Sequence, residues 1–377
     1  MSISPLKFYQ ILKKNEVRFF TGVPDSLLKQ FCLCLDNNVQ DKEHIIAANE
    51  GNAISLATGH HLATGKIPLV YMQNSGLGNA VNPLLSLSDT SVYSIPILLL
   101  IGWRGEPGIN DEPQHLKQGK IQLDIMRTLG IPYEVISGNE IDIDKKIAHC
   151  VKKALGKSCP IALIVKKGTF NVYKSPATNS SQDKLMTREE SLEIVLKNLP
   201  KDSLIISTTG KTSREIFEIR EKHESKHSSD FLTVGSMGHC SSIALGIAIS
   251  ARSRNIICID GDGSLIMHMG SLCTIGNIGP KNFFHILINN FVHDSVGGQP
   301  TAAKIIDMKK LVKSNNYKYF LSVTKKNELV KNLDSFIKSI GPSFLEIIVK
   351  PGARNNLIRP TISPAENKRI FMDNINK

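Results

Sequence analysis

Short apolar runs alternate with amphipathic segments along nearly the whole chain. The strongest run, residues 94–101, is typical of a strand buried on both faces of a parallel sheet, and it is far too short to span a bilayer. Strands that alternate with helical stretches predict parallel α/β structure, because parallel strands need a long crossover between them. The 377 residues are enough for about two such domains.

The runs with strand character fall into two groups. The first half of the chain has strands predicted at residues 44–47, 68–72, 95–101 and 161–166. The second half has strands predicted at residues 204–207, 231–234, 256–259 and 284–288. Between the groups, residues 169–185 are polar, rich in Ser and Lys, and without periodicity, which is typical of a linker.

A helix is predicted to begin after this segment, because Thr187 and Glu190 form the pattern of a capping box. We therefore predict an α/β protein with two doubly wound parallel-sheet domains, a linker between them and an irregular tail. The predicted bounds are residues 1–168 for the first domain, 169–186 for the linker, 187–350 for the second domain and 351–377 for the tail.

The chain carries excess positive charge, with 46 Lys and Arg against 34 Asp and Glu. Such an excess suits nucleic acid, a membrane surface or an anionic metabolite, but the basic residues form no long block with interleaved aromatics, which disfavours nucleic acid. Residues 1–10 lack the pattern of a secretory signal, and the seven cysteines form no CxxC pair. We therefore expect buried thiols in a cytoplasmic protein that does not bind membranes.

The most specific segment covers residues 255–290. It opens with a strand, continues through Asp-Gly-Asp-Gly-Ser at 260–264 and a helical stretch at 265–275, and ends with a second apolar run and two asparagines. A helix N-terminus attracts phosphate groups, and glycines let the backbone approach them closely. Asp262 and Asn290 offer the oxygen ligands that Mg²⁺ prefers. A lone Gly-Asp-Gly is more often a plain turn, but its strand and helix context favours a phosphate site.

This segment resembles the signature of thiamine diphosphate enzymes, in which Gly-Asp-Gly is followed by Asn-Asn after the next strand. The resemblance implies that thiamine diphosphate and Mg²⁺ are the cofactors. The implied cofactor-binding residues here are Gly261, Gly263 and Ser264. The implied metal ligands are Asp262, Asn290 and the backbone carbonyl of Val292.

A second part of the signature lies where the strand at 44–47 runs into a helix with Glu50 at the junction. The resemblance implies that Glu50 protonates N1′ of the aminopyrimidine, which activates the thiazolium C2. A glutamate near an apolar ring has a raised pKa, as a proton donor near neutrality needs. Taken alone, Glu50 could equally be a first-turn carboxylate favoured by the helix dipole.

Two glycine-containing loops complete the implied cofactor site. In the loop at 235–239, Met237 matches the apolar residue that holds the cofactor bent, and the carbonyl of Gly235 would accept a hydrogen bond from its 4′-amino group. Ser75 and Gly76 resemble the loop beside the thiazolium.

Two other patterns look like nucleotide-binding motifs but are incomplete. Thr-Gly-Lys-Thr at 209–212 looks like the end of a P-loop, yet Ile205 stands where the first glycine is needed. Gly76 and Gly78 begin like a dinucleotide fingerprint, yet Val81 stands where the third glycine is needed. We therefore expect neither motif to function as such.

The two halves resemble the pyrimidine-binding and diphosphate-binding domains of the thiamine diphosphate-dependent decarboxylase superfamily. Most relatives place a third domain between them, which is absent here. This compact form resembles the decarboxylases of phosphonopyruvate and of sulfopyruvate, and the former more closely. The resemblance is carried by residues 21–26, 103–108, 111–115 and 292–301. It implies a homodimer or larger homo-oligomer with active sites at the subunit interface.

The implied reaction converts phosphonopyruvate, a small anionic 2-oxo acid, to phosphonoacetaldehyde and CO₂ in phosphonate biosynthesis. Pyruvate decarboxylases carry a catalytic glutamate shortly after the Asn-Asn pair, but Val296 stands there in this chain. Proton delivery is therefore expected from another residue. His115 is the first candidate, because it lies where those enzymes carry paired histidines, and His293 and Asp25 are weaker candidates.

Arg104 follows the strand at 95–101 on a Gly- and Pro-rich loop, where ligand sites of α/β proteins occur. Because arginine binds oxyanions in a bidentate manner, we expect Arg104 to bind the phosphonate. Lys120, Arg354 and Arg359 are secondary candidates, for which a solvated surface charge is the more common explanation.

A sulfopyruvate decarboxylase and a catalytically silent thiamine diphosphate protein that serves as an assembly partner remain alternatives. A carboligase is disfavoured by the missing domain.

Overall fold

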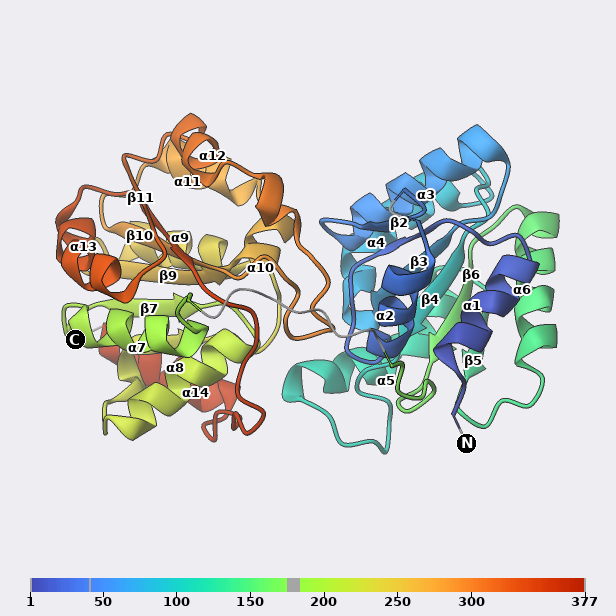
Figure 1. Ribbon diagram of the computed structural model, residues 1–377, viewed down its shortest axis with the longest axis horizontal. Helices are drawn as coiled ribbons and strands as arrows, with labels where there is room; N and C mark the ends of the chain where they lie inside the picture. Colours follow the sequence, from blue (N-terminus) through green and yellow to red (C-terminus); the bar gives the residue numbers. More distant parts are fainter. Residues whose placement is uncertain (1, 41, 175–183, 376–377) are drawn as a thin grey trace. The chain divides into compact units, whose positions relative to one another are not determined.

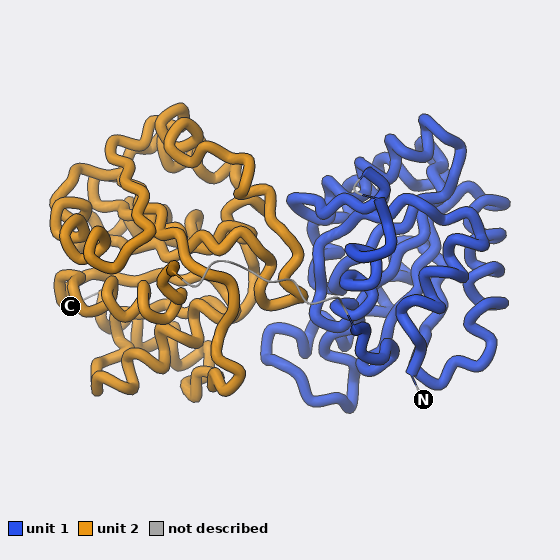
Figure 2. The backbone as a smooth tube through the Cα atoms, viewed as in Figure 1, with its two compact units in different colours: residues 1–178 blue, residues 179–377 orange. Residues whose placement is uncertain are grey.

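The computed structural model of the protein describes residues 2–40, 42–174 and 184–375. The chain divides into two compact units, residues 1–178 and 179–377 (Figure 2). The division falls within the predicted linker at 169–186, of which residues 175–183 lie outside the described part of the chain. Each unit is built on a six-stranded sheet in which every pairing is parallel, as the alternating sequence pattern predicts.

Unit 1 has the strand order β2-β1-β3-β4-β6-β5 (Figure 1). Its strands are β1 (Phe20–Gly22), β2 (His44–Ile46), β3 (Leu69–Gln73), β4 (Leu98–Gly102), β5 (Tyr133–Ile136) and β6 (Ile161–Val165). One face of the sheet is covered by α1 (Pro5–Lys14), α2 (Lys29–Asn38) and α6 (Ile143–Lys157). The other face is covered by α3 (Glu50–Thr64), the 3₁₀ turn η1 (Asn74–Gly76), α4 (Leu77–Pro83), the π-turn η2 (Leu84–Ser88) and α5 (Pro113–Thr128).

Unit 2 has the strand order β11-β12-β10-β9-β7-β8. Its strands are β7 (Leu204–Ser207), β8 (Asp230–Leu232), β9 (Ile256–Gly261), β10 (Phe283–Asn289), β11 (Tyr319–Val323) and β12 (Ser343–Ile348). One face carries α7 (Arg188–Asn198), α8 (Lys211–Lys222) and α13 (Lys326–Lys338). The other carries α9 (Cys240–Ser250), α10 (Asp262–Met267), α11 (Ser271–Ile278), α12 (Met308–Ser314) and α14 (Pro364–Ile375). Short 3₁₀ turns, η3 (His227–Ser229) and η4 (Ala302–Ile305), lie in the connections.

All eight predicted strands are confirmed, with ends shifted by up to three residues. The fully apolar runs became central strands such as β4 and β10, whose residues are all buried. The strands that the sequence analysis missed are β1, β5, β11 and β12. Of these, β5 and β11 lie at sheet edges and are only partly buried, so their apolar signal is weak. The capping box at Thr187 is confirmed.

Two predicted features of unit 2 are wrong. The helical stretch at 265–275 is broken at 268–270, where α10 ends and α11 begins. The tail at 351–377 is not irregular throughout, because α14 forms within it. This helix is fixed by tertiary contacts: Phe371 is buried, and the Asn367 side chain donates to the Asp230 carbonyl at 2.8 Å and accepts from the Leu232 amide at 3.2 Å.

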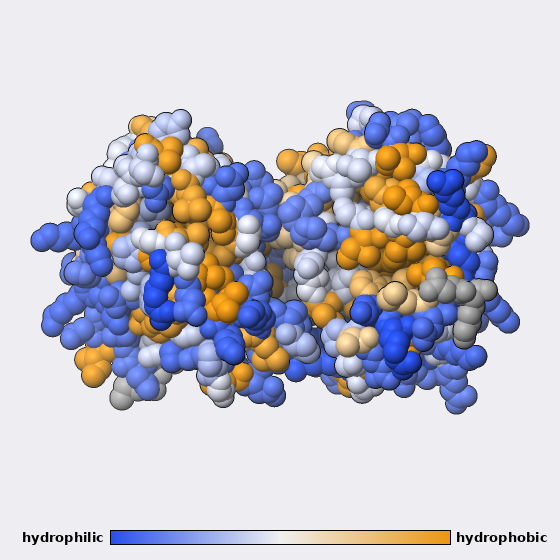
Figure 3. All heavy atoms as spheres, turned by 180° about the vertical axis from the view of Figure 1, so that it is seen from behind, coloured by the Kyte–Doolittle hydropathy of each residue, from blue (hydrophilic) through white to orange (hydrophobic). Residues whose placement is uncertain are grey.

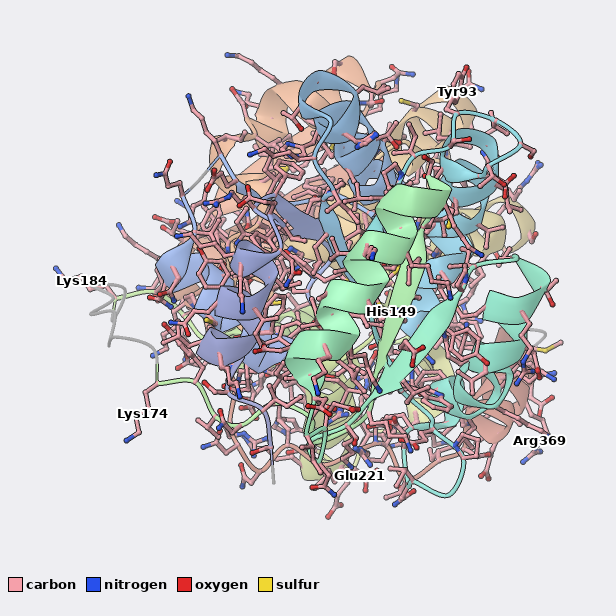
Figure 4. All side chains as sticks on the ribbon, turned by 90° about the vertical axis from the view of Figure 1, so that its right-hand side faces the viewer. Tyr93, His149, Lys174, Lys184, Glu221 and Arg369 are labelled. Carbon is pink, nitrogen blue, oxygen red and sulfur yellow. The ribbon has the colours of Figure 1, made fainter. Side chains whose placement is uncertain are left out.

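Polar and charged side chains project from the outer faces of the helices. His149 on α6, Glu221 on α8 and Arg369 on α14 are exposed at the surface (Figure 4). Six of the seven cysteines are buried, and all are free thiols as expected. In the described part of the chain, the helices are too short or too polar to cross a membrane.

Candidate functional site

The carboxyl edge of the unit 2 sheet brings the two predicted metal ligands together. Strands β9 and β10 are parallel neighbours, and Gly261 is paired with Ile288 in their register. Asp262 follows β9 directly and Asn290 follows β10, so both residues lie at the same edge. Both side chains are buried, with 3% of Asp262 and 6% of Asn290 exposed. Residues 28 positions apart in sequence are thus adjacent at one sheet edge.

The Asp262 carboxylate is suited to hold a cation. Burial raises its pKa to about 6, although a hydrogen bond from the Thr301 hydroxyl opposes the shift. A buried carboxylate is costly unless a positive charge compensates it. The Asn290 amide oxygen, which accepts a hydrogen bond from the Val292 amide at 3.1 Å, is a second hard oxygen donor at this edge.

This donor set fits Mg²⁺ better than a transition metal. The described residues contain no group of three or more His, Cys, Asp or Glu side chains that could hold a metal ion. Mg²⁺ typically binds through one or two carboxylates together with phosphate oxygens and water. One carboxylate, one amide oxygen and a backbone carbonyl therefore fit a Mg²⁺ ion that also binds a diphosphate.

The turn at 261–264, the predicted phosphate turn, is closely packed on its inner side. A Cβ atom at Gly263 would lie 3.0 Å from the His293 ring and 3.5 Å from the terminal methyl group of Met237. A side chain at this position would therefore require the His293 ring to shift by a few tenths of an ångström, and the three residues lie together at the start of α10. Burial lowers the pKa of His293 to about 4, so its ring is neutral at pH 7.

Ser264 joins this turn to two other loops. Its hydroxyl accepts hydrogen bonds from the Thr208 hydroxyl and from the Gly238 amide, each at 3.0 Å. Gly238 has φ +87°, a conformation in which side chains are strained. The loop at 235–239, which carries Met237, is thus fastened beside the phosphate turn.

Thr208 is a candidate residue that the sequence analysis missed. It directly follows strand β7 at the same sheet edge and directly precedes the Thr-Gly-Lys-Thr pattern, which is incomplete as a P-loop. The signal available in the sequence was a Thr-Thr-Gly turn directly after a predicted strand, where α/β proteins bind ligands.

In unit 1, Glu50 is the first residue of α3 and is only 5% exposed. Burial raises the pKa of its carboxyl group, although the Asn79 side chain, which donates to it at 2.7 Å, opposes the shift. A Cβ atom at Gly76 would collide with the carboxylate, so the loop of Ser75 and Gly76 must lie directly against Glu50. Local sequence patterns do not reveal Asn79, because its partner Glu50 lies 29 residues away.

A second polar group in unit 1 surrounds Asp25, which is 1% exposed. Burial raises the pKa of Asp25 to about 6, and the positive charge of Arg104 opposes the shift. One carboxylate oxygen accepts from the Leu27 amide at 3.0 Å, whereas the other has no hydrogen-bond partner in the described chain. A Cβ atom at Gly102 would collide with this carboxylate, which places Asp25 against the end of β4.

His115 is also buried in unit 1, at the first turn of α5. Its Nδ1 atom lacks a hydrogen-bond partner among the described residues. Burial, and then the nearby charge of Arg104, lower the pKa of His115 to about 4. Its ring is therefore neutral at pH 7.

Arg104 is engaged within unit 1. Its guanidinium forms a bidentate ion pair with Asp111, in which Nε lies 2.8 Å from one carboxylate oxygen, and Nη1 donates to the Ser26 hydroxyl at 2.7 Å. Although burial opposes it, the hydrogen bonds from Arg104 and from backbone amides lower the pKa of Asp111 well below its usual range. Three of the five N–H groups of Arg104 are thus used, and its charge is matched by a carboxylate.

The secondary candidates for substrate binding lie at the surface. Lys120 is exposed on α5, and Arg359 is exposed in the segment before α14. Arg354 forms a bidentate pair with Glu189 at 2.7 and 2.9 Å and a further ion pair with Glu218. These pairs hold the segment after β12 against α7 and α8, which is a structural use of Arg354.

Two family models match the chain and cover its two units. The N-terminal TPP binding domain of thiamine pyrophosphate enzymes matches residues 7–127, and the C-terminal TPP binding domain matches residues 208–347. Thiamine pyrophosphate is another name for thiamine diphosphate. The chain therefore belongs to the thiamine pyrophosphate enzymes, in a form that has both cofactor-binding domains and no domain between them.

Within this class, the chain is similar to two phosphonopyruvate decarboxylases. It is 31% identical to that of Streptomyces viridochromogenes and 29% identical to that of Streptomyces hygroscopicus, in each case over 93% of this chain and 89% of the relative. It is also 26% identical to the sulfopyruvate decarboxylase of Methanosarcina acetivorans, over 98% of this chain and 97% of the relative.

Proposed function

We propose that this protein is a thiamine diphosphate- and Mg²⁺-dependent carboxy-lyase that converts phosphonopyruvate to phosphonoacetaldehyde and CO₂ in phosphonate biosynthesis. The similarity to phosphonopyruvate decarboxylases over 93% of the chain carries the proposal. Sulfopyruvate decarboxylation is the second candidate, because the similarity to the Methanosarcina protein covers 98% of the chain. The free, mostly buried thiols suit a reducing cytoplasm as the place of action.

The bound cofactor would supply the electron sink for the electrons left behind by CO₂. Asp262, Asn290 and the Val292 carbonyl would hold Mg²⁺ against the diphosphate. Gly261, Gly263 and Ser264 would let the backbone approach the phosphate groups. Met237 and Gly235 would support the bent cofactor, and Glu50 would hold a proton at N1′ of its pyrimidine ring.

Asp25 is a better proton donor than His115, the first candidate from the sequence. A carboxyl group with a pKa of about 6 is protonated in part near neutrality and can donate a proton, as general acids must. A histidine with a pKa of about 4 is neutral and cannot act as an imidazolium acid at that pH. We therefore propose Asp25 as the acid and His115 as a neutral hydrogen-bonding partner of the substrate, with His293 near the phosphate turn.

The test is a comparison of CO₂ release from phosphonopyruvate, sulfopyruvate and pyruvate by the same enzyme preparation. We expect the highest kcat/KM on phosphonopyruvate. A higher value on sulfopyruvate would support the second candidate. Tight cofactor binding without CO₂ release from any substrate would instead support a catalytically silent assembly partner.

Arg104→Ala tests whether this residue binds the phosphonate. Pyruvate lacks the phosphonate, and losing a hydrogen bond to a charged group costs about 1.5 to 3 kcal/mol, so we expect the variant to lose roughly 10- to 100-fold more kcat/KM on phosphonopyruvate than on pyruvate. Because the substitution strands the carboxylate of Asp111, the double variant Arg104→Ala/Asp111→Ala is the matched control for loop stability. Equal losses on both substrates in both variants would mean that Arg104 only holds its loop.

We further propose that the smallest active unit is a homodimer in which each active site combines unit 1 of one subunit with unit 2 of the other. Apolar side chains reach the surface of both units (Figure 3). Leu62 on α3, for example, is 71% exposed, and such apolar surface suits burial in a subunit interface.

Mixing two inactive variants tests this arrangement. Glu50→Gln and Asp262→Ala homodimers should each be nearly inactive, but a hybrid dimer would contain one site with both native residues. We expect CO₂ release to recover after subunit exchange, which is verified by mass spectrometry of the native assembly. Verified exchange without recovery would indicate that each site forms within one chain.

A further inference from the structure

The loop that follows β10, residues 290–301, connects several parts of the proposed cofactor site. It is closed by hydrogen bonds from the His293 amide to the Gln299 carbonyl at 2.7 Å and from the Thr301 amide to the Phe291 carbonyl at 2.9 Å. Two of its side chains contact the phosphate turn: the Thr301 hydroxyl donates to Asp262, and the His293 ring lies against Gly263.

Asp294, in the same loop, is anchored to three other segments of unit 2. Its Oδ2 atom lies 3.2 Å from Nη1 of Arg188 on α7 and 3.3 Å from Nζ of Lys211 on α8. Its carbonyl accepts from Nζ of Lys211 at 3.1 Å. Its Oδ1 atom accepts from the Gly352 amide, after β12, at 3.2 Å. One residue therefore ties the loop to both helices and to the segment after the last strand.

The anchor on α7 is itself held in place. Arg188 is buried and forms a bidentate ion pair with Glu215, with N–O distances of 2.7 and 2.9 Å. Together with Lys211 and Asp294, these residues form a cluster of two cations and two carboxylates. Since the charges balance and Glu215 fixes the guanidinium, Arg188 presents a rigid donor to the loop.

We propose that Asp294 is a positioning residue that holds this loop so that Thr301 and His293 keep their contacts with the phosphate turn, and that cofactor retention depends on it. The proposal rests on the proposed Mg²⁺ and thiamine diphosphate site. Asp294 touches neither Asp262 nor Gly263 in the described contacts but acts through its neighbours in the loop. Residues that orient metal ligands from outside the coordination shell typically contribute about 10- to 100-fold to affinity.

Asp294→Asn tests the proposal without stranding a buried charge, because Arg188 keeps its pair with Glu215. Calorimetric titration with thiamine diphosphate in the presence of Mg²⁺ should show a dissociation constant raised by roughly 10- to 100-fold. At saturating cofactor, kcat should be largely retained, because the loop is then held by the ligand. Lys211→Met should weaken cofactor binding in the same direction, and it carries the test if Asp294→Asn does not fold.

Asp334→Asn is the matched control, since Asp334 pairs with Lys338 at 2.7 Å on the exposed surface of α13. This control should bind the cofactor as the wild type does. Wild-type affinity in Asp294→Asn and Lys211→Met would overturn the positioning role. A loss of cofactor affinity that is accompanied by losses of kcat and of thermal stability would also overturn it, because the three losses together would indicate general unfolding. If the wild-type protein itself failed to bind the cofactor, the proposed function would fall instead.

Discussion

Glu50→Gln is expected to reduce CO₂ release by roughly 10²- to 10⁴-fold, the usual contribution of a general acid or base. The side chain keeps its size, and Asn79, which donates to it at 2.7 Å, can still donate to an amide oxygen. Fold and cofactor binding should therefore persist. An amide cannot hold an exchangeable acid proton at N1′, so exchange of the C2 proton of the bound cofactor, followed by NMR, should slow together with turnover.

Glu43→Gln is the matched control for this variant. Glu43 lies seven residues upstream of Glu50, before β2, and is exposed, so the same substitution there should leave both turnover and proton exchange unchanged. Near-normal C2 exchange in Glu50→Gln would contradict the catalytic assignment. In that case the buried carboxylate at the start of α3 would be a structural group that the helix dipole stabilises.

Asp262→Ala is expected to abolish cofactor retention. The variant removes the single carboxylate of the proposed Mg²⁺ site, so its effect should exceed the roughly 10- to 100-fold that residues outside the coordination shell contribute. It also leaves the Thr301 hydroxyl without its acceptor, which should loosen the loop at 290–301. Equilibrium dialysis with thiamine diphosphate and Mg²⁺ measures the loss directly.

Two further variants distinguish the effect of losing the metal-binding carboxylate from the effect of loosening the loop at 290–301. Thr301→Val removes the hydrogen bond to Asp262 but keeps the carboxylate, and it should weaken cofactor binding less than Asp262→Ala does. Asp334→Ala, on the exposed surface of α13, should retain wild-type binding. If Asp262→Ala bound the cofactor with wild-type affinity, the diphosphate would not depend on a metal held at this sheet edge.

The alternation of strands and helices, the capping box at Thr187 and the Gly-Asp-Gly turn were predictable because each is a local pattern. A phosphate turn needs glycines and a helix N-terminus in one short stretch, and a buried parallel strand needs one continuous apolar run. The same reasoning placed Glu50 at a junction of strand and helix. Edge strands such as β5 and the helix α14 escaped prediction, because their burial depends on distant neighbours.

What the tertiary structure decided is which side chains meet, since pairing depends on residues far apart in sequence. The sequence predicts that Arg104 binds the phosphonate of the substrate, and the fold places it in an ion pair with Asp111 and a hydrogen bond with Ser26, 78 residues away. The fold likewise buries Asp25, and desolvation raises the pKa of its carboxyl group, which makes it a candidate proton donor. Local spacing fixes residue types and their order, whereas burial and charge pairing, which set pKa values, arise only when separate segments pack together.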